Sequence, residues 1–322
     1  MDILFLGIGL LLLLLTIYDF FYTTLSGSGA GFISKKVASL TYQGLRKFSE
    51  PTNRKAFEYS GMVVNLCVLL VWILVVWFGL FLVFSYDPEG ITNSSARPAN
   101  WVERLYYTGY ILSTLGVGNF KPVTPFFEMM TAIFSFFGFI FFTSSMTYLI
   151  SVSSAVIRKR TLSRSISTLG KNPSEIAKKL RSLQPSYRDQ QILSLQEKIT
   201  SHLVSHQAYP VVHFFSHQNA ENCFNLNFVR LDEAVTNLLS ENKEDISGST
   251  GKEELQLLRS TMNDLLMHMK ENFSNSLPQP QNYKEIKNVG EASLDQRRNL
   301  LLSMLKSEKF EWNDLKDSSR LD

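Results

Sequence analysis

The chain of 322 residues has few cysteines and little net charge, and each shortage excludes a class of protein. Cys67 lies in an apolar run and Cys223 in a polar segment, so the sequence implies no disulfide framework. This usage fits a reducing, cytosolic setting for the second half. A formal net charge of +3 is too small to indicate a nucleic-acid partner.

Several signatures of known chemistry are also missing. No GxGxxG follows a strand pattern, which argues against a dinucleotide-binding domain, and no cyclic-nucleotide-type β-roll is apparent. No nucleophile, metal or phosphate-loop constellation indicates an enzyme, and no organic cofactor is expected. No helix carries Arg or Lys at every third position, so a voltage-sensor helix is absent.

Long apolar runs dominate the first half of the chain. Three of them, residues 3–22, 62–84 and 126–152, reach the length of about 20 residues that a membrane-spanning helix needs. The first could instead be a secretory signal, but no Lys or Arg precedes it and the residues after Tyr22 offer no good small-x-small cleavage site. We therefore interpret it as a retained helix.

Basic residues in the connecting segments predict the orientation. They gather between the first two spans (Lys35, Lys36, Arg46, Lys47, Arg54 and Lys55) and after the third (Arg158, Lys159, Arg160, Arg164 and Lys171). Because cytoplasmic loops carry an excess of Lys and Arg, the N-terminus and residues 86–125 are expected outside, extracellular or periplasmic. The C-terminal half is expected in the cytoplasm of a multi-pass cell-membrane protein.

A short amphipathic helix is predicted between the first two spans. Its apolar positions recur at helical spacing until Pro51: Ile33, Val37, Leu40, Gly44, Leu45 and Phe48. The helix either lies on the inner membrane surface or connects by packing on the soluble domain.

The loop between the second and third spans carries the most informative motif. Residues 101–113 can form a helix too short and too polar to span, which indicates a re-entrant helix. The sequence TLGVG follows, and irregular backbone at membrane depth is tolerated where it lines a water-filled cavity. If Gly116 and Gly118 adopt positive φ, successive backbone carbonyls turn to one side of the segment. Several such segments around an axis would then form cages of oxygen atoms that can hold cations. The helix C-terminus would add a partial negative charge.

This stretch resembles the pore region of tetrameric potassium channels, whose filter pattern is T-V-G-Y-G-D. Thr114, Gly116 and Gly118 match, Leu115 is a mild change, and Val117 and Asn119 depart. The resemblance covers about residues 63–152 and implies a homotetramer in a lipid bilayer, with K⁺ as the permeant ion. The alternative is an ordinary Gly-rich extracellular turn.

The flanks of the motif extend the resemblance. Tyr106-Tyr107 sits where such channels carry pore-helix aromatics, and KPVTPF is similar to their Y-P-V-T turn. Gly138 falls at the position of their inner-helix gating hinge, although glycine is also a common packing residue in membrane helices. Helical spacing from Gly138 then places three residues toward the cavity: Phe142, Met146 and Ile150. Nearby Ser and Thr side chains would hydrate the cavity or bond back to their own helix.

The departures bear on selectivity. Val117 cannot donate the hydrogen bond that the family's filter tyrosine makes, so rigidity must come from packing. Tyr110 and Asn119 stand where several members pair a Glu with an Asp, and losing both carboxylates leaves no orphan charge.

The C-terminal half is expected to be an all-α cytosolic domain. Helices are predicted from Asn172, from Pro185 to about Gln207, and over 226–240, 252–273 and 292–308, with YPVVHFF as a short strand candidate. His202, His206, His213 and His217 form two H-x₃-H pairs, a spacing that can chelate zinc. With no cysteine ligand nearby and a helix break between the pairs, we expect ordinary or pH-sensing histidines and no metal site. Trp312 is expected to anchor the tail.

The predicted fold is thus an all-α membrane protein with three transmembrane helices and a re-entrant pore loop, followed by a helical cytosolic domain. Its segments are 1–60 (first helix and linker helix), 61–153 (pore module) and 154–322 (cytosolic domain). The predicted function is a potassium-selective channel, not an enzyme, without voltage-sensor gating. A weakly selective monovalent cation channel and a non-conducting scaffold or sensor remain the alternatives.

Overall fold

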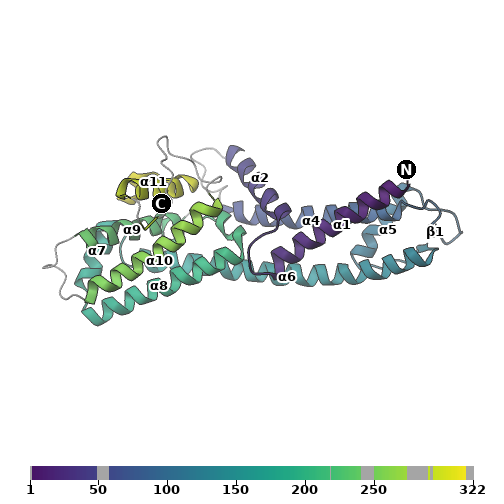
Figure 1. Cartoon of the computed structure of the whole chain (residues 1–322). Helices are drawn as coiled ribbons and strands as arrows, with labels where there is room; N and C mark the ends of the chain where they lie inside the picture. The colour runs from purple at the N-terminus through teal and green to yellow at the C-terminus, as the bar shows by residue number, and fades with distance from the viewer. Residues whose placement is uncertain are drawn as a thin grey trace. The chain divides into compact units, whose positions relative to one another are not determined.

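The computed structural model describes residues 2–48, 58–217, 219–240, 250–273, 289–290 and 293–316. These residues are almost entirely helical, with one two-stranded sheet (Figure 1). The chain divides into two compact units, which we call the first unit (Met1–Leu40 with Val64–Val152) and the second unit (Thr41–Val63 with Ser153–Asp322). The division predicted from the sequence follows the chain, whereas these units interleave along it.

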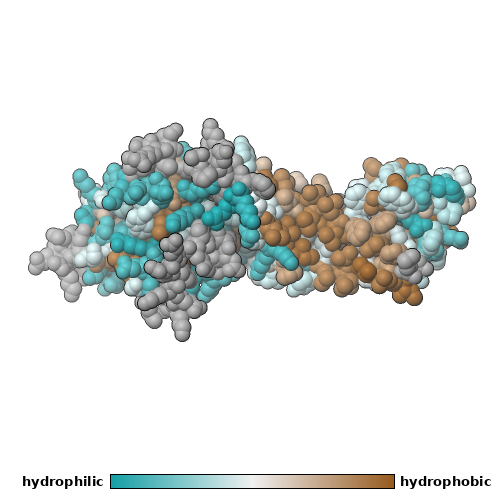
Figure 2. Space-filling model, turned by 90° about the horizontal axis from the view of Figure 1, so that it is seen from above, coloured by the Kyte–Doolittle hydropathy of each residue, from teal (hydrophilic) through white to brown (hydrophobic). Residues whose placement is uncertain are grey.

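Three of the described helices are long and apolar enough to cross a membrane. They are α1 (Asp2–Leu25), α4 (Ser60–Phe84) and α6 (Pro125–Ser167), and each contains one predicted span. Figure 2 shows hydrophobic side chains gathered in a brown band over the surface of this part of the chain. The all-α membrane fold is thereby confirmed.

The third helix is longer than the sequence predicted. α6 does not end near Val152 but continues to Ser167. Beyond Val152 its buried positions keep a helical spacing: Ala155, Val156, Lys159, Leu162, Ser163 and Ile166. No Gly or Pro follows before Gly170, so nothing in this stretch breaks the helix. The change from an apolar to an amphipathic pattern marks a change of surroundings and not a helix end.

The loop after α4 contains a small sheet and a short helix. β1 (Ile91–Asn93) pairs antiparallel with β2 (Phe120–Pro122), and α5 (Trp101–Leu112) lies between them in sequence. In Figure 1, α5 and β1 lie at the same end of the first unit as the N-terminus of α1. The structure therefore places the predicted re-entrant helix and the chain start on one side of the bundle.

The predicted amphipathic helix is confirmed as α2 (Phe32–Phe48). Its buried positions are Ser34, Ala38 and Tyr42, one residue out of register with the predicted apolar stripe. Leu40 of that stripe is 61% exposed, and Phe32 is 78% exposed. The helix thus packs through small and hydroxylated residues and leaves apolar side chains uncovered.

The second unit is an all-helical domain around one core. It contains α7 (Pro173–Ser182), α8 (Pro185–Ala208), α9 (Phe224–Ser240), α10 (Thr250–Phe273), α11 (Leu294–Ser307) and the 3₁₀ helices η2 (Ala220–Asn222) and η3 (Trp312–Leu315). Asn172 caps α7 through the Glu175 amide, as its sequence predicted. α9 is buried on almost every side, and Trp312 packs against the core as expected.

The strand prediction for YPVVHFF is wrong. Residues Pro210–Phe214 form the 3₁₀ helix η1, with the Val212 amide donating to the Tyr209 carbonyl over 3.0 Å. Val211, Val212 and Phe214 are all buried, so the alternation of a half-buried strand is lacking. Pro210 starts the turn because its fixed φ suits a first helical position.

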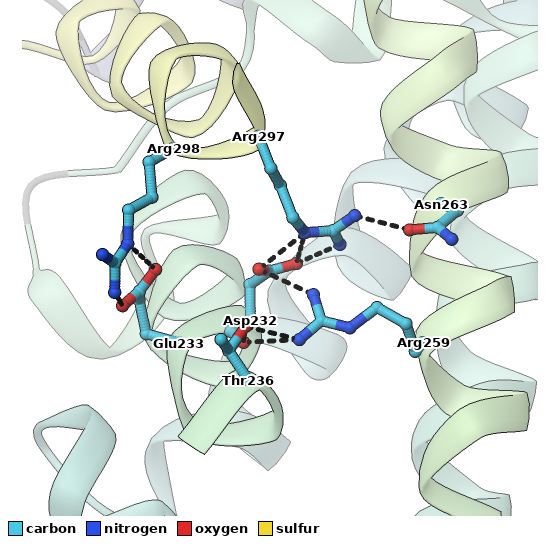
Figure 3. Close-up of polar contacts among 7 residues, drawn as sticks. All are labelled: Asp232, Glu233, Thr236, Arg259, Asn263, Arg297 and Arg298. Carbon is cyan, nitrogen blue, oxygen red and sulfur yellow. Dashed lines mark hydrogen bonds and ion pairs between the residues drawn. The ribbon is translucent and has the colours of Figure 1, made fainter. Parts of the chain in front are cut away.

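A buried charge network joins three helices of the second unit (Figure 3). Asp232 of α9 is fully buried and accepts hydrogen bonds from Arg259 of α10 (2.8 Å) and Arg297 of α11 (2.9 Å). Arg259 also donates to Thr236 and Arg297 to Asn263. Beside it, Glu233 pairs with Arg298 at 2.6 Å, and this arginine is 40% exposed. Two guanidinium groups share one carboxylate, which fixes the three helices to each other.

Candidate functional site

The re-entrant helix α5 is fixed at its start by local hydrogen bonds. The Asn100 side chain accepts from the Glu103 amide, and the Glu103 carboxylate accepts from the Asn100 amide, which is a complete capping box. Along the helix, the Trp77 indole of α4 donates to the Leu105 carbonyl over 3.0 Å. The helix ends at Leu112 with Ser113 as its C-cap, directly before TLGVG, so its C-terminus is held where that segment begins.

The backbone of the TLGVG segment alternates in hand. Gly116 and Gly118 have φ values of 59° and 77°, in the left-handed region as the sequence predicted. Thr114 is also left-handed, with φ of 58°, which the sequence did not reveal because non-glycine residues rarely adopt it. Leu115 and Val117, between them, lack positive φ. Alternating hand along an extended segment turns successive carbonyls to the same side.

The segment is uncovered within a single chain. All residues from Ser113 to Asn119 are exposed, with Leu115 at 67% and Val117 at 48%, and burial resumes at Phe120. Exposure of Leu115 and Val117 to water contributes no hydrophobic stabilisation to the segment. The arrangement is one that further copies of the chain could cover.

Tyr110 supports the segment from the side. Its hydroxyl donates to the Phe120 carbonyl over 2.9 Å, joining α5 to the chain just after Asn119. Tyr106 and Tyr107 pack edge-on against the Tyr110 ring, and the Tyr107 hydroxyl is 2.7 Å from that of Thr131 in α6. Sequence reasoning noted the lost carboxylate at Tyr110 but missed this bond, because its acceptor is a backbone carbonyl.

The small sheet holds the far end of the segment. Phe120 pairs with Asn93 and Pro122 with Ile91, and the Val123 amide donates to the Gly90 carbonyl over 2.9 Å. A Cβ at Gly90 would lie 1.8 Å from the Phe127 ring, so only glycine fits there. Both ends of TLGVG are therefore tied to neighbouring elements.

Gly138 has a packing reason to be glycine. A Cβ on this residue of α6 would lie 2.1 Å from the Leu112 carbonyl oxygen, at the last turn of α5. The packing alternative thus has direct structural support, while the hinge role stays a prediction. Close contact here sets the distance between α6 and the start of TLGVG.

The predicted cavity residues share one face of α6. Phe142, Met146 and Ile150 are 65%, 47% and 65% exposed in the single chain. Thr143 and Thr147, on the adjacent face, donate to carbonyls one turn back in their own helix. For these two threonines the bonding alternative is confirmed.

Four of the histidines lie close together in the second unit. His206, His213 and His268 lie around the Phe273 ring, and His202 packs against His206 with ring centres 5.6 Å apart. His206 Nδ1 is 3.0 Å from His268 Nε2. Among the described residues, no group of three or more His, Cys, Asp or Glu side chains has metal-binding geometry. Burial, reinforced by the nearby Lys159 charge and His268, lowers the pKa of His213 to about 3. His217 lies apart, 3.6 Å from Glu58.

The sequence reasoning overlooked Asp19, a buried acid inside the first apolar run. Its carboxylate accepts from the Trp72 indole of α4 over 2.9 Å and from the Ile33 amide at the start of α2 over 2.8 Å. The signal was available, since an ionisable residue within a spanning segment is costly and indicates a specific role.

Two spanning helices that flank a short helix and an alternating extended segment define a pore-loop ion channel. Comparison with known families agrees, because a family model described as "Ion channel" matches residues 68–154. A relative, "Uncharacterized membrane protein YdjJ" of Bacillus subtilis (strain 168), is 32% identical over 231 residues, which cover 71% of this chain and 67% of the relative. The chain belongs to the same family of membrane proteins as this relative, and its residues 68–154 match the ion-channel family model. No solved structure matches it significantly.

Proposed function

We propose that the protein is a homotetrameric potassium channel in which residues 114–118 form the selectivity filter. The observation that carries this proposal is the alternation of left-handed φ at Thr114, Gly116 and Gly118. Carbonyl oxygens turned to one side can replace the hydration shell of a cation when identical strands surround an axis. The exposure of this segment in one chain supports assembly around it.

This proposal also assigns roles to the inner face of α6 and a side of the membrane to each end of the chain. Phe142, Met146 and Ile150 line the inner cavity, Gly138 permits α6 to approach α5, and the N-terminus lies outside with the second unit in the cytoplasm. Gating does not use a voltage-sensor helix, because no spanning helix carries regularly spaced basic residues.

A weakly selective monovalent cation channel is the second candidate. It is favoured by Val117 and Asn119, which replace a hydrogen-bonding tyrosine and a carboxylate of the resembling family. The Tyr110–Phe120 bond supports strict selectivity instead, since it fastens the chain beyond the filter. Reversal potentials in mixed Na⁺ and K⁺ distinguish the two.

The test is K⁺ flux into liposomes that contain the purified protein, with Gly116→Ala and Gly7→Ala compared. A Cβ at either glycine meets no atom of the described residues within 4 Å, but of the two only Gly116 has positive φ. Alanine costs roughly 1–2 kcal/mol in the left-handed region, and four subunits would bear this cost together. Gly116→Ala should therefore abolish most flux while Gly7→Ala keeps it.

Equal flux from both variants would remove the filter assignment. Correct assembly with no flux from the wild type would favour the non-conducting scaffold or sensor.

A further inference from the structure

The N-terminus of α2 is capped by a carboxylate from another helix. Asp19 of α1 is 3% exposed, and its oxygens accept from the Ile33 amide (2.8 Å), the Ser34 amide (3.1 Å) and the Ser34 hydroxyl. The Thr23 hydroxyl accepts from the Gly31 amide over 2.9 Å. A carboxylate at a helix N-terminus satisfies free amides and complements the helix dipole. We call this contact the Asp19 junction.

The junction fixes where α2 begins. Asp19 lies within the last two turns of α1, which ends at Leu25, and its carboxylate also binds the Trp72 indole of α4. A Cβ on Gly31 would lie 2.0 Å from an Asp19 oxygen, so the chain passes very close to the carboxylate. The first turns of α2 are therefore held at the inner end of the first span, in the proposed orientation.

The outward face of these turns combines cations with apolar side chains. Phe32 is 78% and Leu40 61% exposed, and Lys35 and Lys36 are exposed beside them. The Lys36 ammonium lies 5.9 Å from the centre of the Phe32 ring. All charged residues of α2 are basic, because no Asp or Glu occurs between Phe32 and Phe48. A helix with this composition suits the boundary between acyl chains and anionic headgroups.

We propose that Phe32, Lys35, Lys36 and Leu40 form a binding surface for anionic phospholipid of the cytoplasmic leaflet. The two ammonium groups meet the lipid phosphates, while Phe32 and Leu40 enter the acyl-chain boundary. Charge complementarity and the position of the helix at the end of a span commit the surface to a lipid and not to a soluble anion. The proposal rests on the orientation proposed above, but not on ion selectivity.

The junction also connects this surface with the inner helix. Phe20, next to Asp19, stacks on Phe141 of α6 with ring centres 4.4 Å apart and meets Phe137 edge-on. Trp72 meets Tyr148 of α6 at 6.4 Å. Phe137 is the neighbour of Gly138, so these ring contacts join the Asp19 junction to the part of α6 that touches α5.

The test measures lipid binding by the full-length protein in neutral detergent. Energy transfer from tryptophan to pyrene-labelled phosphatidylglycerol reports binding, and labelled phosphatidylcholine serves as the zwitterionic probe. Lys35→Gln/Lys36→Gln should weaken phosphatidylglycerol binding roughly thirtyfold at low salt, since each basic residue near an anionic surface contributes a several-fold gain. Added salt should reduce the difference.

The matched control is Lys178→Gln/Lys179→Gln, which removes two adjacent exposed lysines from α7. It should bind phosphatidylglycerol like the wild type. Equal binding by the wild type and the α2 variant, or equal loss in the control, would overturn the lipid surface. Because lipid binding is measured without ion flux, the binding result can be interpreted even if the channel proposal fails.

Discussion

At the scale of single residues, Tyr110 makes a hydrogen bond next to the proposed filter. Its bond to the Phe120 carbonyl links α5 to the end of the proposed filter, at the place where both carboxylates of the resembling pattern are missing. A neutral donor on a backbone carbonyl needs no charge pair and no desolvation of ions.

Tyr110→Phe removes this bond and keeps the ring contacts. A hydrogen bond of this kind contributes about 1 kcal/mol, so we expect reduced discrimination of K⁺ over Na⁺ in each channel. Reversal potentials in mixed cations measure it, with Tyr106→Phe as the control on the neighbouring ring. An unchanged reversal potential would show that packing alone holds the filter.

Gly138→Ala tests packing against hinging. A Cβ 2.1 Å from the Leu112 oxygen forces α5 and α6 apart, and overpacking of this kind costs about 1–3 kcal/mol. We therefore expect a lower thermal unfolding temperature in detergent, with Gly44→Ala as control, because a Cβ there meets nothing within 4 Å. Unchanged stability with altered open probability would favour the hinge instead.

At the scale of helices, α9, α10 and α11 depend on one buried carboxylate. Asp232→Asn leaves Arg259 and Arg297 facing a neutral amide, and breaking a buried ion pair costs about 3–5 kcal/mol. Denaturant unfolding of the full chain should show this loss. Glu233→Gln, whose Arg298 partner is 40% exposed, should cost about 1 kcal/mol or less. Equal effects of the two substitutions would contradict the network's central role.

The histidines between α8, η1 and α10 predict acid sensitivity. Burial lowers the pKa of His202, His206 and His213 below the ordinary value of 6.5. The unfolded chain then binds more protons, so stability is complete above about pH 6.5 and falls as the pH drops toward the folded values. Within the part of the chain that the structure describes, neither buried ring nitrogen of His202 has a hydrogen-bond partner. His202→Leu therefore removes a protonation site without breaking a bond, and it should reduce the loss. Unfolding midpoints between pH 7 and pH 4 check it, and an identical pH profile would contradict it.

At the scale of the whole molecule, the proposed filter needs partners that one chain does not supply. Leu115 and Val117 are exposed in the single chain, and a ring of carbonyl oxygens requires several copies. Native mass spectrometry of the purified complex should give four chains. A monomer or dimer that still conducts would contradict the shared filter.

Much of this architecture could be predicted from the sequence. The three spans, α5 and most helices of the second unit follow from apolar run length, helical periodicity and capping residues, which act locally. The left-handed backbone at Gly116 and Gly118 could be predicted too, because the freedom of glycine at positive φ is also a local property. The sequence did not predict that α6 continues past Val152, and it suggested a strand where the chain forms a 3₁₀ helix at Pro210. The hydropathy of a segment depends on its surroundings more than on its backbone conformation.

The sequence by itself determined the membrane-spanning helices, the re-entrant helix and the positions where only glycine tolerates the backbone. Tertiary structure alone decided that Tyr110 bonds to Phe120, that Asp19 caps α2, that Gly138 touches Leu112 and that Asp232 joins three helices. These contacts join residues distant along the chain or end on backbone atoms. A linear pattern of side chains does not record them, because their energy depends on the distance between groups in the folded chain.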